Sequence, residues 1–312
     1  MVAERIVSLL PSATEIVCAL GLEDRLVGIS HSCDYPPSVQ KLPRLSRPRT
    51  NLAGLSSGEI DAAIRAALRD YGSVYEIDIE AIRNLEPDLV ITQGICEVCA
   101  VPESQIVAAA VGGAILTLDA HDLAAIFDSI RAVGRATGVS DRAEQLVAEL
   151  ELRIRRVRDR VAGKPRPRVL ALEWLDPPYA PGHWVPELID IAGGELLAGT
   201  ARRPSYRLEW SELQALDPEV LLVMPCGFDL EATLREAAFH RRELRAVGGR
   251  VHLLDASAYF SRSGPRVVEG LEILASAFAA YISHREPRLD PRDRPAHIPL
   301  QRDVQDRTPG HP

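Results

Sequence analysis

Two runs of alternating strand-like and helix-like segments, separated by one long amphipathic stretch, constrain the fold of this chain more than any other feature. The first run covers residues 1–138 and the second covers residues 164–283. In both runs the strand-like segments are short and almost entirely apolar, as in ERIVSLL and EVLLVMP, which is typical of parallel strands covered on both faces by helices. The pattern therefore predicts an α/β fold with two Rossmann-like lobes, each built on a parallel sheet.

The stretch between the two runs, residues 139–163, predicts a single long helix that joins the lobes. Its apolar residues recur three and four positions apart from Ser140 to Ala162 and define one stripe: Ala143, Leu146, Val147, Leu150, Ile154 and Val157. Such a helix extends roughly 34 Å, about the width of a domain. The remaining segment, residues 284–312, contains six prolines and six arginines but few apolar residues, so we expect a disordered tail.

Composition and motifs exclude several classes of function. The formal net charge of −8 disfavours a protein that binds the phosphate backbone of nucleic acids, and 5% aromatic residues are too few for a platform that stacks single-stranded bases. No segment approaches the ~20 apolar residues of a membrane span. The motifs of phosphoryl transfer, hydride transfer, serine hydrolysis and zinc proteolysis do not occur. We therefore expect a binding protein rather than an enzyme.

The beginning of the chain carries no recognisable export signal. The apolar segment at residues 6–21 is interrupted by Pro11 and Glu15, and it lacks a positively charged flank, a cleavage site and a lipidation cysteine. We therefore expect a cytoplasmic protein. If translation starts upstream of Met1, we expect a periplasmic or otherwise extracytoplasmic one.

Residues that directly follow the strands are candidate site residues, because ligands of open parallel sheets bind outside the carboxyl ends of the strands. The candidates carry aromatic rings, ring nitrogens, thiols, amides or charges: His31, Cys33, Asp34, Tyr35, Gln93, Trp174, Tyr179, His183, Trp184, Cys226, Phe228, Phe260 and Arg262. In EWLDPPYAPGHWVPEL, residues 173–188, prolines stiffen a loop that suits a large, flat, apolar ligand. The same rings could instead fold back on the core. His183 could be an axial ligand to a metal carried by that ligand, or a hydrogen-bond donor.

Four of the five cysteines follow predicted strands directly and permit a metal site. Cys33, Cys96 and Cys99, together with His31, offer thiolate and imidazole groups, which are ligands for zinc or iron. Cys96 and Cys99 also have the C-x-x-C spacing of a reactive or redox-active thiol pair. A metal site, a reactive thiol pair and thiols that simply pack in the interior therefore stay open as alternatives.

Two predicted helix beginnings carry polar residues suited to their positions. Ser12 is placed to cap the first helix, and Glu15, three residues later, completes a capping box. At the last helix, Pro265 suits the first turn and Ser263 can cap it. Arg262 beside this helix N-terminus predicts a corner that accepts an anionic group of the ligand, such as a carboxylate or phosphate.

Three local patterns carry a resemblance to a known family: IVSLLPSATEIVCALGLEDRLVGISHSCDYP, IEAIRNLEPDLVIT and the long helical stretch Ser140–Ala162. Over about residues 4–283 the chain resembles the class III substrate-binding proteins that serve ABC importers of metal chelates. Members of this family take up vitamin B12, haem or iron siderophores. The segments WLDPPYAPGHWVPELIDIAGG and FSRSGPRVVEGLEILA look most similar to the cobalamin-binding branch.

The resemblance implies a transport function. A soluble, periplasmic-binding-protein-like chain would hold a corrinoid (cobalamin-like) or a related metal chelate in a cleft between the lobes, and the long helix would be a stiff backbone about which the lobes move little. The ligand would lie flat, with aromatic side chains against its faces and edges: Trp174, Tyr179, Trp184 and Phe260.

The resemblance also implies an ABC permease as partner if the chain is exported. Such a permease grips exposed acidic residues, for which Glu59, Glu80 and Glu231 are candidates. Two alternatives differ from transport. A cytoplasmic metal- or thiol-dependent enzyme could use the cleft cysteines and His31, and a sensing or scaffolding module could recruit partners through the tail.

Overall fold

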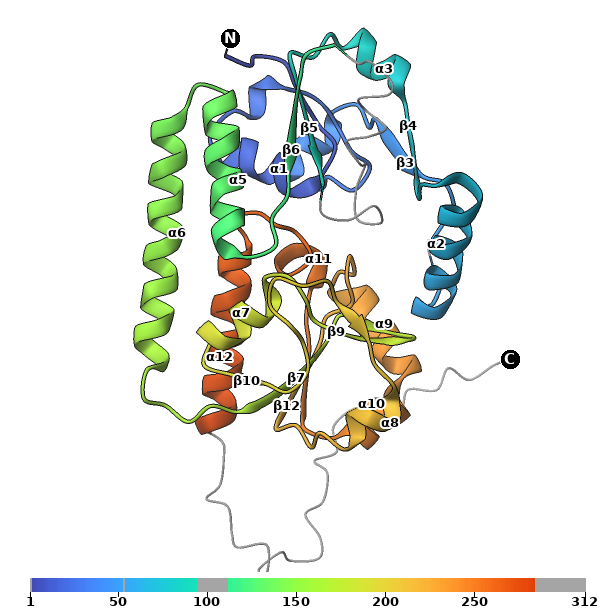
Figure 1. Cartoon of the computed structure of the whole chain (residues 1–312), viewed down its shortest axis with the longest axis vertical. Coiled ribbons are helices and arrows are strands. Elements are labelled where there is room, and N and C mark those ends of the chain that lie inside the picture. Colours follow the sequence, from blue (N-terminus) through green and yellow to red (C-terminus); the bar gives the residue numbers. More distant parts are fainter. Residues whose placement is uncertain (1, 53, 95–111, 284–312) are drawn as a thin grey trace, which may run out of the picture.

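The computed structural model describes residues 2–52, 54–94 and 112–283, which form two α/β lobes, one above the other in Figure 1. The predicted α/β class with two lobes is confirmed. Cys96, Cys99 and the tail at 284–312 lie outside the described residues, as does the segment 103–111, for which the sequence predicts a helix.

The N-terminal lobe is built on a parallel sheet. In its described part four strands run in the order β2–β1–β5–β6, with these bounds: β1 Ile6–Ser8, β2 Leu26–Ile29, β5 Leu89–Gln93 and β6 Ala114–Leu118. Every residue of the central strands β1 and β5 is buried. Central strands covered on both faces have no solvent side, which explains why these segments are almost uninterrupted apolar runs.

Helices and a small antiparallel sheet complete this lobe. The helices are α1 Pro11–Ala19, α2 Ser57–Tyr71, α3 Ile79–Asn84 and α5 Leu123–Ala136, with short 3₁₀ turns η1 Glu23–Arg25 and η2 Pro37–Lys41. Strands β3 (Ser46–Pro48) and β4 (Tyr75–Ile77) pair antiparallel. The helix α2 lies between these two strands in the chain, so the small sheet anchors both of its ends to the lobe.

The C-terminal lobe repeats the parallel architecture. Its described strands run β10–β7–β12–β13, with bounds β7 Arg168–Leu172, β10 Glu195–Leu196, β12 Val220–Val223 and β13 Arg250–Leu253. The surrounding helices are α7 Val185–Ile191, α8 Trp210–Gln214, α9 Leu230–Phe239, α10 Arg241–Val247 and α11 Ala256–Tyr259. An antiparallel sheet, β11–β9–β8, folds over the end of β7: β8 Trp174–Leu175, β9 Pro178–Ala180 and β11 Tyr206–Arg207.

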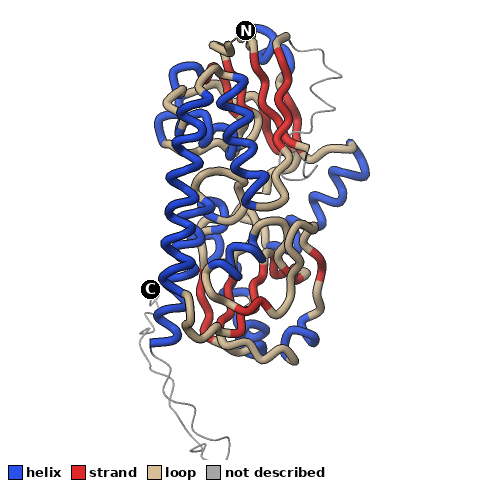
Figure 2. Tube along the Cα trace, turned by 60° about the vertical axis from the view of Figure 1, so that its left-hand side comes forward, coloured by secondary structure: helices blue, strands red, loops and turns tan. Residues whose placement is uncertain are grey.

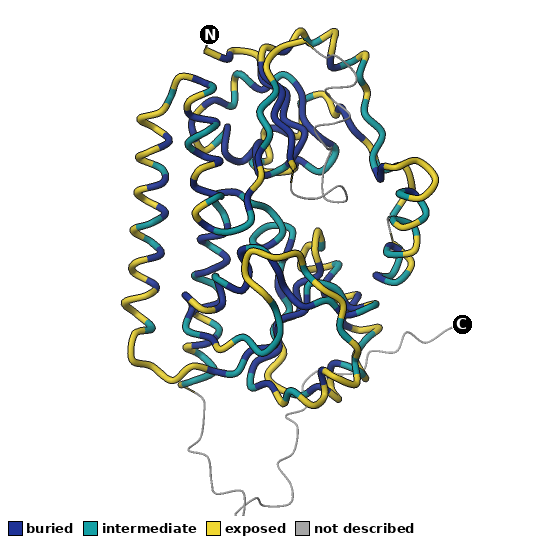
Figure 3. Tube along the Cα trace, in the orientation of Figure 1, coloured by how far each residue is buried: buried dark blue, intermediate teal, exposed yellow. Residues whose placement is uncertain are grey.

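The predicted long helix is α6, Ser140–Val161, and it runs alongside both lobes (Figure 2). Its buried positions match the predicted stripe, except that Leu146 is only partly buried: Ala143, Val147, Leu150, Ile154 and Val157. Figure 3 shows this stripe as the dark side of a helix whose outer side is exposed. The stripe packs against α5 of the first lobe and α12 (Val267–Ser283) of the second, so one helix buries apolar surface with both lobes.

On the side opposite α6, helix α2 reaches the C-terminal lobe (Figure 1). The backbone N–H of Ser57 donates to Glu236 Oε1 on α9 at 3.2 Å, and the Ser57 hydroxyl donates to the same oxygen. Glu236 is only 2% exposed, and His240 Nε2 lies 3.0 Å from the same oxygen. The buried carboxylate of Glu236 therefore accepts hydrogen bonds from the first residue of α2, at the helix end where the helix dipole favours a negative charge.

Candidate functional site

The carboxyl ends of both parallel sheets face the space between the lobes. We call the segments that follow these strand ends the inter-lobe region: residues 31–35, 119–122, 173–184, 226–228 and 255–266. Most of the residues predicted from the strand-end rule lie in these segments.

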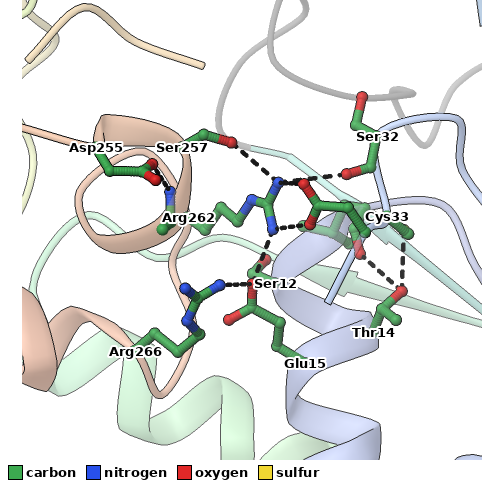
Figure 4. Close-up of polar contacts among 12 residues, drawn as sticks. Ser12, Thr14, Glu15, Ser32, Cys33, Asp255, Ser257, Arg262 and Arg266 are labelled. Carbon is green, nitrogen blue, oxygen red and sulfur yellow. Dashed lines mark hydrogen bonds and ion pairs between the residues drawn. The ribbon is translucent and has the colours of Figure 1, made fainter. Parts of the chain in front are cut away.

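Arg262 forms the central ion-pair network of this region (Figure 4). It lies between α11 and α12 and donates to Glu15 Oε1 at 3.0 Å and to the two oxygens of Asp34 at 2.6 and 3.0 Å. It also donates to Ser257 Oγ at 3.1 Å. Because Glu15 and Asp34 belong to the N-terminal lobe, this side chain joins the two lobes electrostatically.

Glu15 is the buried acid of the network. Its side chain is 2% exposed, and the guanidinium of Arg266 lies 3.5 Å from Oε1. Burial raises the pKa of Glu15, and the hydrogen bond and charge of Arg262 partly offset that shift. The other oxygen, Oε2, is buried without a hydrogen-bond partner, so the ionised form of Glu15 depends on the two arginines.

The structure differs from the sequence in two respects at the helix beginnings: the cap of α1 and the anion bound by Arg262. The capping box of Ser12 with Glu15 is wrong: Leu10 is the N-cap of α1 without a side-chain cap, and Pro11 starts the helix. Proline suits this first position because its missing N–H has no partner there in any case. Arg262 does lie beside an acidic group, but the anions it binds in this structure are carboxylates of the protein itself.

Aromatic side chains from both lobes gather beside this network. The guanidinium of Arg266 lies 4.1 Å from the ring centre of Tyr35 and 4.9 Å from that of Tyr259, within the range of cation–π attraction. The Trp174 and Phe228 rings meet edge to face at 5.3 Å. Tyr35 is 44% exposed, so part of this aromatic surface is open to solvent.

A histidine pair also crosses between the lobes. His121 Nδ1 lies 3.2 Å from His183 Nδ1, and His121 Nε2 lies 3.1 Å from Asp119 Oδ1. Burial lowers the pKa of His183, and the neighbouring His121 lowers it further, which favours the neutral imidazole. Beside the pair, Arg202 and Asp122 form a 2.7 Å ion pair.

Several predicted residues are buried rather than open. Trp184 is 7% exposed, and its indole N–H donates to the Phe260 carbonyl at 3.0 Å; Phe260 is 3% exposed. Gln93 is 5% exposed. Buried aromatic rings of this kind hold the loops that carry the open side chains.

The thiols and His31 have separate surroundings. Cys33 is buried and accepts hydrogen bonding from Thr14 at 3.0 Å, and burial raises the pKa of its thiol. His31 Nδ1 lies 2.9 Å from Ser46 Oγ, while Cys226 is exposed in the other lobe. Burial raises the pKa of Cys18 to about 12, so this thiol is protonated at neutral pH.

The described residues give no support to zinc or iron at the cysteines. Among them no group of three or more histidines, cysteines or acids could hold a metal ion. Cys96 and Cys99, the other members of the predicted set, lie outside the described residues.

Sequence reasoning missed several polar residues of the inter-lobe region: Glu15 as an ion-pair partner, Asp119, His121, Glu173 and Arg266. Asp119 and His121 were detectable, because they directly follow β6. The apolar segment AILTLDA, residues 114–120, predicts a strand that extends to residue 120, whereas β6 ends at Leu118, so Asp119 and His121 follow the strand and belong to the loop.

Glu173 directly follows β7 and accepts a hydrogen bond from the Ser205 hydroxyl. Burial raises the pKa of Glu173 to about 7, although Ser205 and the Gly182 N–H oppose this shift. The carboxyl group therefore changes charge near neutral pH, at the first residue of the aromatic loop 173–188.

A sizeable cavity lies elsewhere. It has a volume of about 450 Å³ and lies at the C-terminal end of α6, lined by residues that include Arg158, Lys164, Arg166 and Asp190. This position is at the far end of the C-terminal lobe, away from the residues that carry the inter-lobe contacts.

Two parallel-sheet lobes, joined along one side by a long helix and with polar and aromatic side chains between them, define a two-lobed binding protein. The chain belongs to the periplasmic binding protein family, whose model matches residues 6–251. The predicted family resemblance is thereby confirmed.

Individual proteins similar to this chain include vitamin B12-binding proteins. The vitamin B12-binding protein of Vibrio cholerae serotype O1 is 26% identical over 277 residues, which cover 86% of this chain and 87% of that protein. The crystal structure of the periplasmic vitamin B12 binding protein BtuF of Vibrio cholerae superposes with a TM-score of 0.67 at 23% identity, covering 89% of this chain and 98% of that one.

A haem-binding protein is also similar to this chain. The apo form of the periplasmic heme-binding protein RhuT from Roseiflexus sp. RS-1 is 29% identical, with a TM-score of 0.62 and coverage of 90% of this chain and 99% of that one. These relatives are binding proteins, so they lend no support to the enzyme alternative. Two of them are periplasmic, and the expectation of a cytoplasmic protein gains no support from them.

Proposed function

We propose that this chain binds a planar metal chelate, a corrinoid or a haem-type tetrapyrrole, between its two lobes and passes it to an ABC permease. The observation that carries the proposal is the convergence of aromatic and cationic side chains from both lobes: Tyr35, Tyr259 and Arg266 in one group, Trp174 and Phe228 in another. Aromatic faces suit a flat, largely apolar macrocycle. The similarity to B12-binding and heme-binding proteins supports the same ligand class.

The proposed ligand contacts are the predicted residues that keep solvent access in the inter-lobe region: His31, Asp34, Tyr35, Trp174, Tyr179, His183, Cys226, Phe228 and Arg262. We assign a supporting role to the buried ones, which are Cys33, Gln93, Trp184 and Phe260. A large flat ligand needs rigid walls, and buried neighbours limit the rotamers of the side chains that touch it.

The proposed permease contacts lie one on each lobe. Glu80 is exposed in the first turn of α3, which Asp78 caps, and Glu231 is exposed in the first turn of α9, which Asp229 caps. The sequences Asp-Ile-Glu-Ala and Asp-Leu-Glu-Ala thus present an acid in the same way on both lobes. Glu59, the third candidate, accepts hydrogen bonds from both the N–H and the hydroxyl of Ser56 at 2.8 Å and so serves as the capping-box acid of α2. Glu231 pairs instead with the exposed side chain of Arg235 at 2.6 Å, so we keep Glu231 and place Glu59 outside this contact.

Delivery to a permease requires that the chain work outside the cytoplasm, and we include this location in the proposal. No helix among the described residues combines the length and apolar character needed to cross a bilayer.

Direct titration tests the proposal. The purified chain is titrated with cobalamin, with haemin and with a ferric hydroxamate siderophore, and tryptophan fluorescence and the chelate absorbance are followed. We expect saturable binding of a tetrapyrrole, weakened by about 1–3 kcal/mol in Trp174→Ala, because anchor aromatics carry such energies. Trp210→Ala is the matched control, since this ring stacks on His240 outside the inter-lobe segments. Binding of none of the three chelates, or equal effects of the two variants, would contradict the proposal.

A further inference from the structure

Helix α2 is an arm that projects from the N-terminal lobe onto the C-terminal lobe (Figure 1). The two-stranded sheet of β3 and β4 holds the chain on either side of this helix, and next to that sheet the Arg49 N–H donates to the Val74 carbonyl at 3.0 Å. Among the described elements, the one that packs most extensively on α2 is β8 of the C-terminal lobe. The arm therefore starts and ends in one lobe but makes its main contact with the other.

The apolar cores of the described chain do not include α2. Its buried apolar residues are Ile60 and Ala67, and neither belongs to the three clusters of buried apolar side chains found among the described residues. The buried stripe of α6, by contrast, is part of the largest of these clusters. A segment that buries little apolar surface opens locally at a free-energy cost far below that of global unfolding. Helix α6 is therefore a fixed connection between the lobes, whereas α2 is a releasable one.

Polar contacts at the first turn of α2 hold it on the C-terminal lobe. Ser57 donates to Glu236 Oε1 from its N–H, at 3.2 Å, and from its hydroxyl, and both residues are buried. His240 Nε2 lies 3.0 Å from the same oxygen, and the Trp210 ring stacks on His240 with 6.0 Å between the ring centres. The C-terminal lobe thus positions the Glu236 carboxylate with its own side chains, ready to accept from α2.

A second contact joins α2 to the hairpin of β8 and β9. Asp176 lies in the turn of this hairpin, and a Cβ placed on Gly58 would be 2.4 Å from Asp176 Oδ2 and 3.6 Å from Asp176 Cβ. The helix approaches the turn this closely because Gly58 has no side chain. The Trp174 indole N–H donates to the Asp176 carbonyl at 3.1 Å. The residue that α2 touches therefore also positions Trp174, one of the proposed ligand contacts.

We propose that α2 is a latch: it closes the inter-lobe region on the side opposite α6, and it leaves the C-terminal lobe when a large flat ligand enters or departs. Gly54 and Gly72 flank the helix in left-handed backbone conformations, with φ 79° and 66°, which glycine adopts and leaves at little cost. Both ends of the arm can therefore turn. The role of the latch in ligand entry rests on the proposed function, whereas the opening of α2 does not.

The competing explanation is a permanent brace, a helix that holds the lobes at a fixed distance and never detaches. A brace and a latch make the same contacts while α2 lies on the C-terminal lobe, but they respond differently to a covalent lock. Locking a brace leaves backbone exchange and ligand kinetics unchanged. Locking a latch slows both, because opening precedes each of them.

The double variant Gly58→Cys with Asp176→Cys supplies the lock. A disulfide needs Cβ atoms about 3.5–4.5 Å apart, and the 3.6 Å between these two positions meets that requirement. The variant is compared with itself, once oxidised with glutathione disulfide and once reduced and freed of reductant, and peptide mapping verifies the bond between positions 58 and 176. The wild-type chain, treated with the same oxidant, controls for the native thiols.

Hydrogen exchange in the absence of any chelate measures the opening itself. We expect the amide hydrogens of α2 to exchange at least about 10-fold more slowly in the oxidised than in the reduced variant, with α6 unchanged. Stopped-flow mixing with cyanocobalamin and, separately, with haemin measures entry. Association with the chelate that binds should slow at least about 10-fold in the oxidised form, and release of preloaded chelate should slow as well. Ser57→Ala weakens the closed position and should have the opposite effect on exchange and association, so it serves as the second variant if the lock does not form.

The outcomes separate this inference from the proposed function. Equal exchange of α2 in the oxidised and reduced forms shows a permanent brace and overturns the latch. Slower exchange with unchanged association kinetics overturns the role in ligand entry and leaves the proposed function standing. Failure of the wild-type protein and of the reduced variant to bind either chelate overturns the proposed function, and the exchange result then decides by itself whether α2 opens.

Discussion

Replacing Arg262 by alanine should destabilise the fold by about 3 kcal/mol at neutral pH. The Arg262 side chain is 9% exposed and that of Glu15 is 2% exposed, with 3.0 Å between their charged atoms. Removing one partner of a buried ion pair costs about 3–5 kcal/mol, because the other charge stays buried and uncompensated. We expect the lower end because Arg266 remains 3.5 Å from Glu15, and because the half-exposed Asp34 can be solvated when it loses its partner.

The destabilisation caused by Arg262→Ala should be smaller at acid pH than at neutral pH. Burial raises the pKa of Glu15 above its ordinary value of 4.5 in the folded state, and removal of Arg262 raises it further. A raised folded-state pKa means that folding favours the protonated acid, so the associated stability is complete below the unfolded-state pKa and is lost as the pH rises through the folded-state pKa. At about pH 4 Glu15 of the variant is protonated in the folded state, and the deficit should approach the ~1 kcal/mol of lost hydrogen bonds.

Urea denaturation at neutral and acid pH measures both quantities. The double variant Arg262→Ala with Glu15→Gln should recover most of the loss at neutral pH, since it removes the uncompensated charge. Asp34→Asn is the control and should change the free energy of unfolding by at most about 1 kcal/mol, as expected of an exposed partner. A single-variant loss below 1 kcal/mol at neutral pH, or no recovery in the double variant, would refute the reasoning.

Three further predictions concern other parts of the molecule. Burial raises the pKa of Glu173 in the folded state to about 7 from an ordinary 4.5, so the free energy of unfolding of the wild-type protein should fall by up to about 3 kcal/mol as the pH rises from 4.5 to 7. In Glu173→Gln the melting temperature should depend less on pH across this range, and parallel melting curves for the two proteins would contradict the assignment. Ser57→Ala removes the hydroxyl that donates to the buried Glu236 of the other lobe, so the free energy of unfolding should fall by about 1–3 kcal/mol and hydrogen exchange in α2 should become faster. Ser38→Ala on the exposed surface should show neither effect. Trp184→Ala should lower the free energy of unfolding by about 3–5 kcal/mol, because this ring is 7% exposed. An unchanged melting temperature would show that the Trp184 ring does not pack in the core.

Much of the fold was predictable from local sequence patterns. The buried strands β1 and β5 are apolar runs with turn residues at their ends, and the stripe of α6 keeps its spacing over six turns of helix. The short antiparallel sheets were not predicted. Strands of two or three residues, such as Trp174–Leu175 and Tyr206–Arg207, are too short to show an alternating pattern, and their pairing depends on residues distant in the chain.

The site was predictable as a region but not as a set of contacts. The strand-end rule located His183 and Arg262, yet it said nothing of their partners. Arg262 and Glu15 are 247 positions apart in the chain, and His121 is 62 positions from His183. No local signal connects residues at such separations.

The sequence by itself determined the α/β class, the two lobes and the helix between them, because hydrophobic periodicity is a local property that follows from the geometry of strands and helices. It also carried the family resemblance in a few contiguous motifs. Only the tertiary structure decided that Arg262 binds the protein's own carboxylates, that Trp184 is buried, and that His121 meets His183. These contacts depend on how the lobes are placed against each other, since burial and charge pairing arise where segments from both halves of the chain come together.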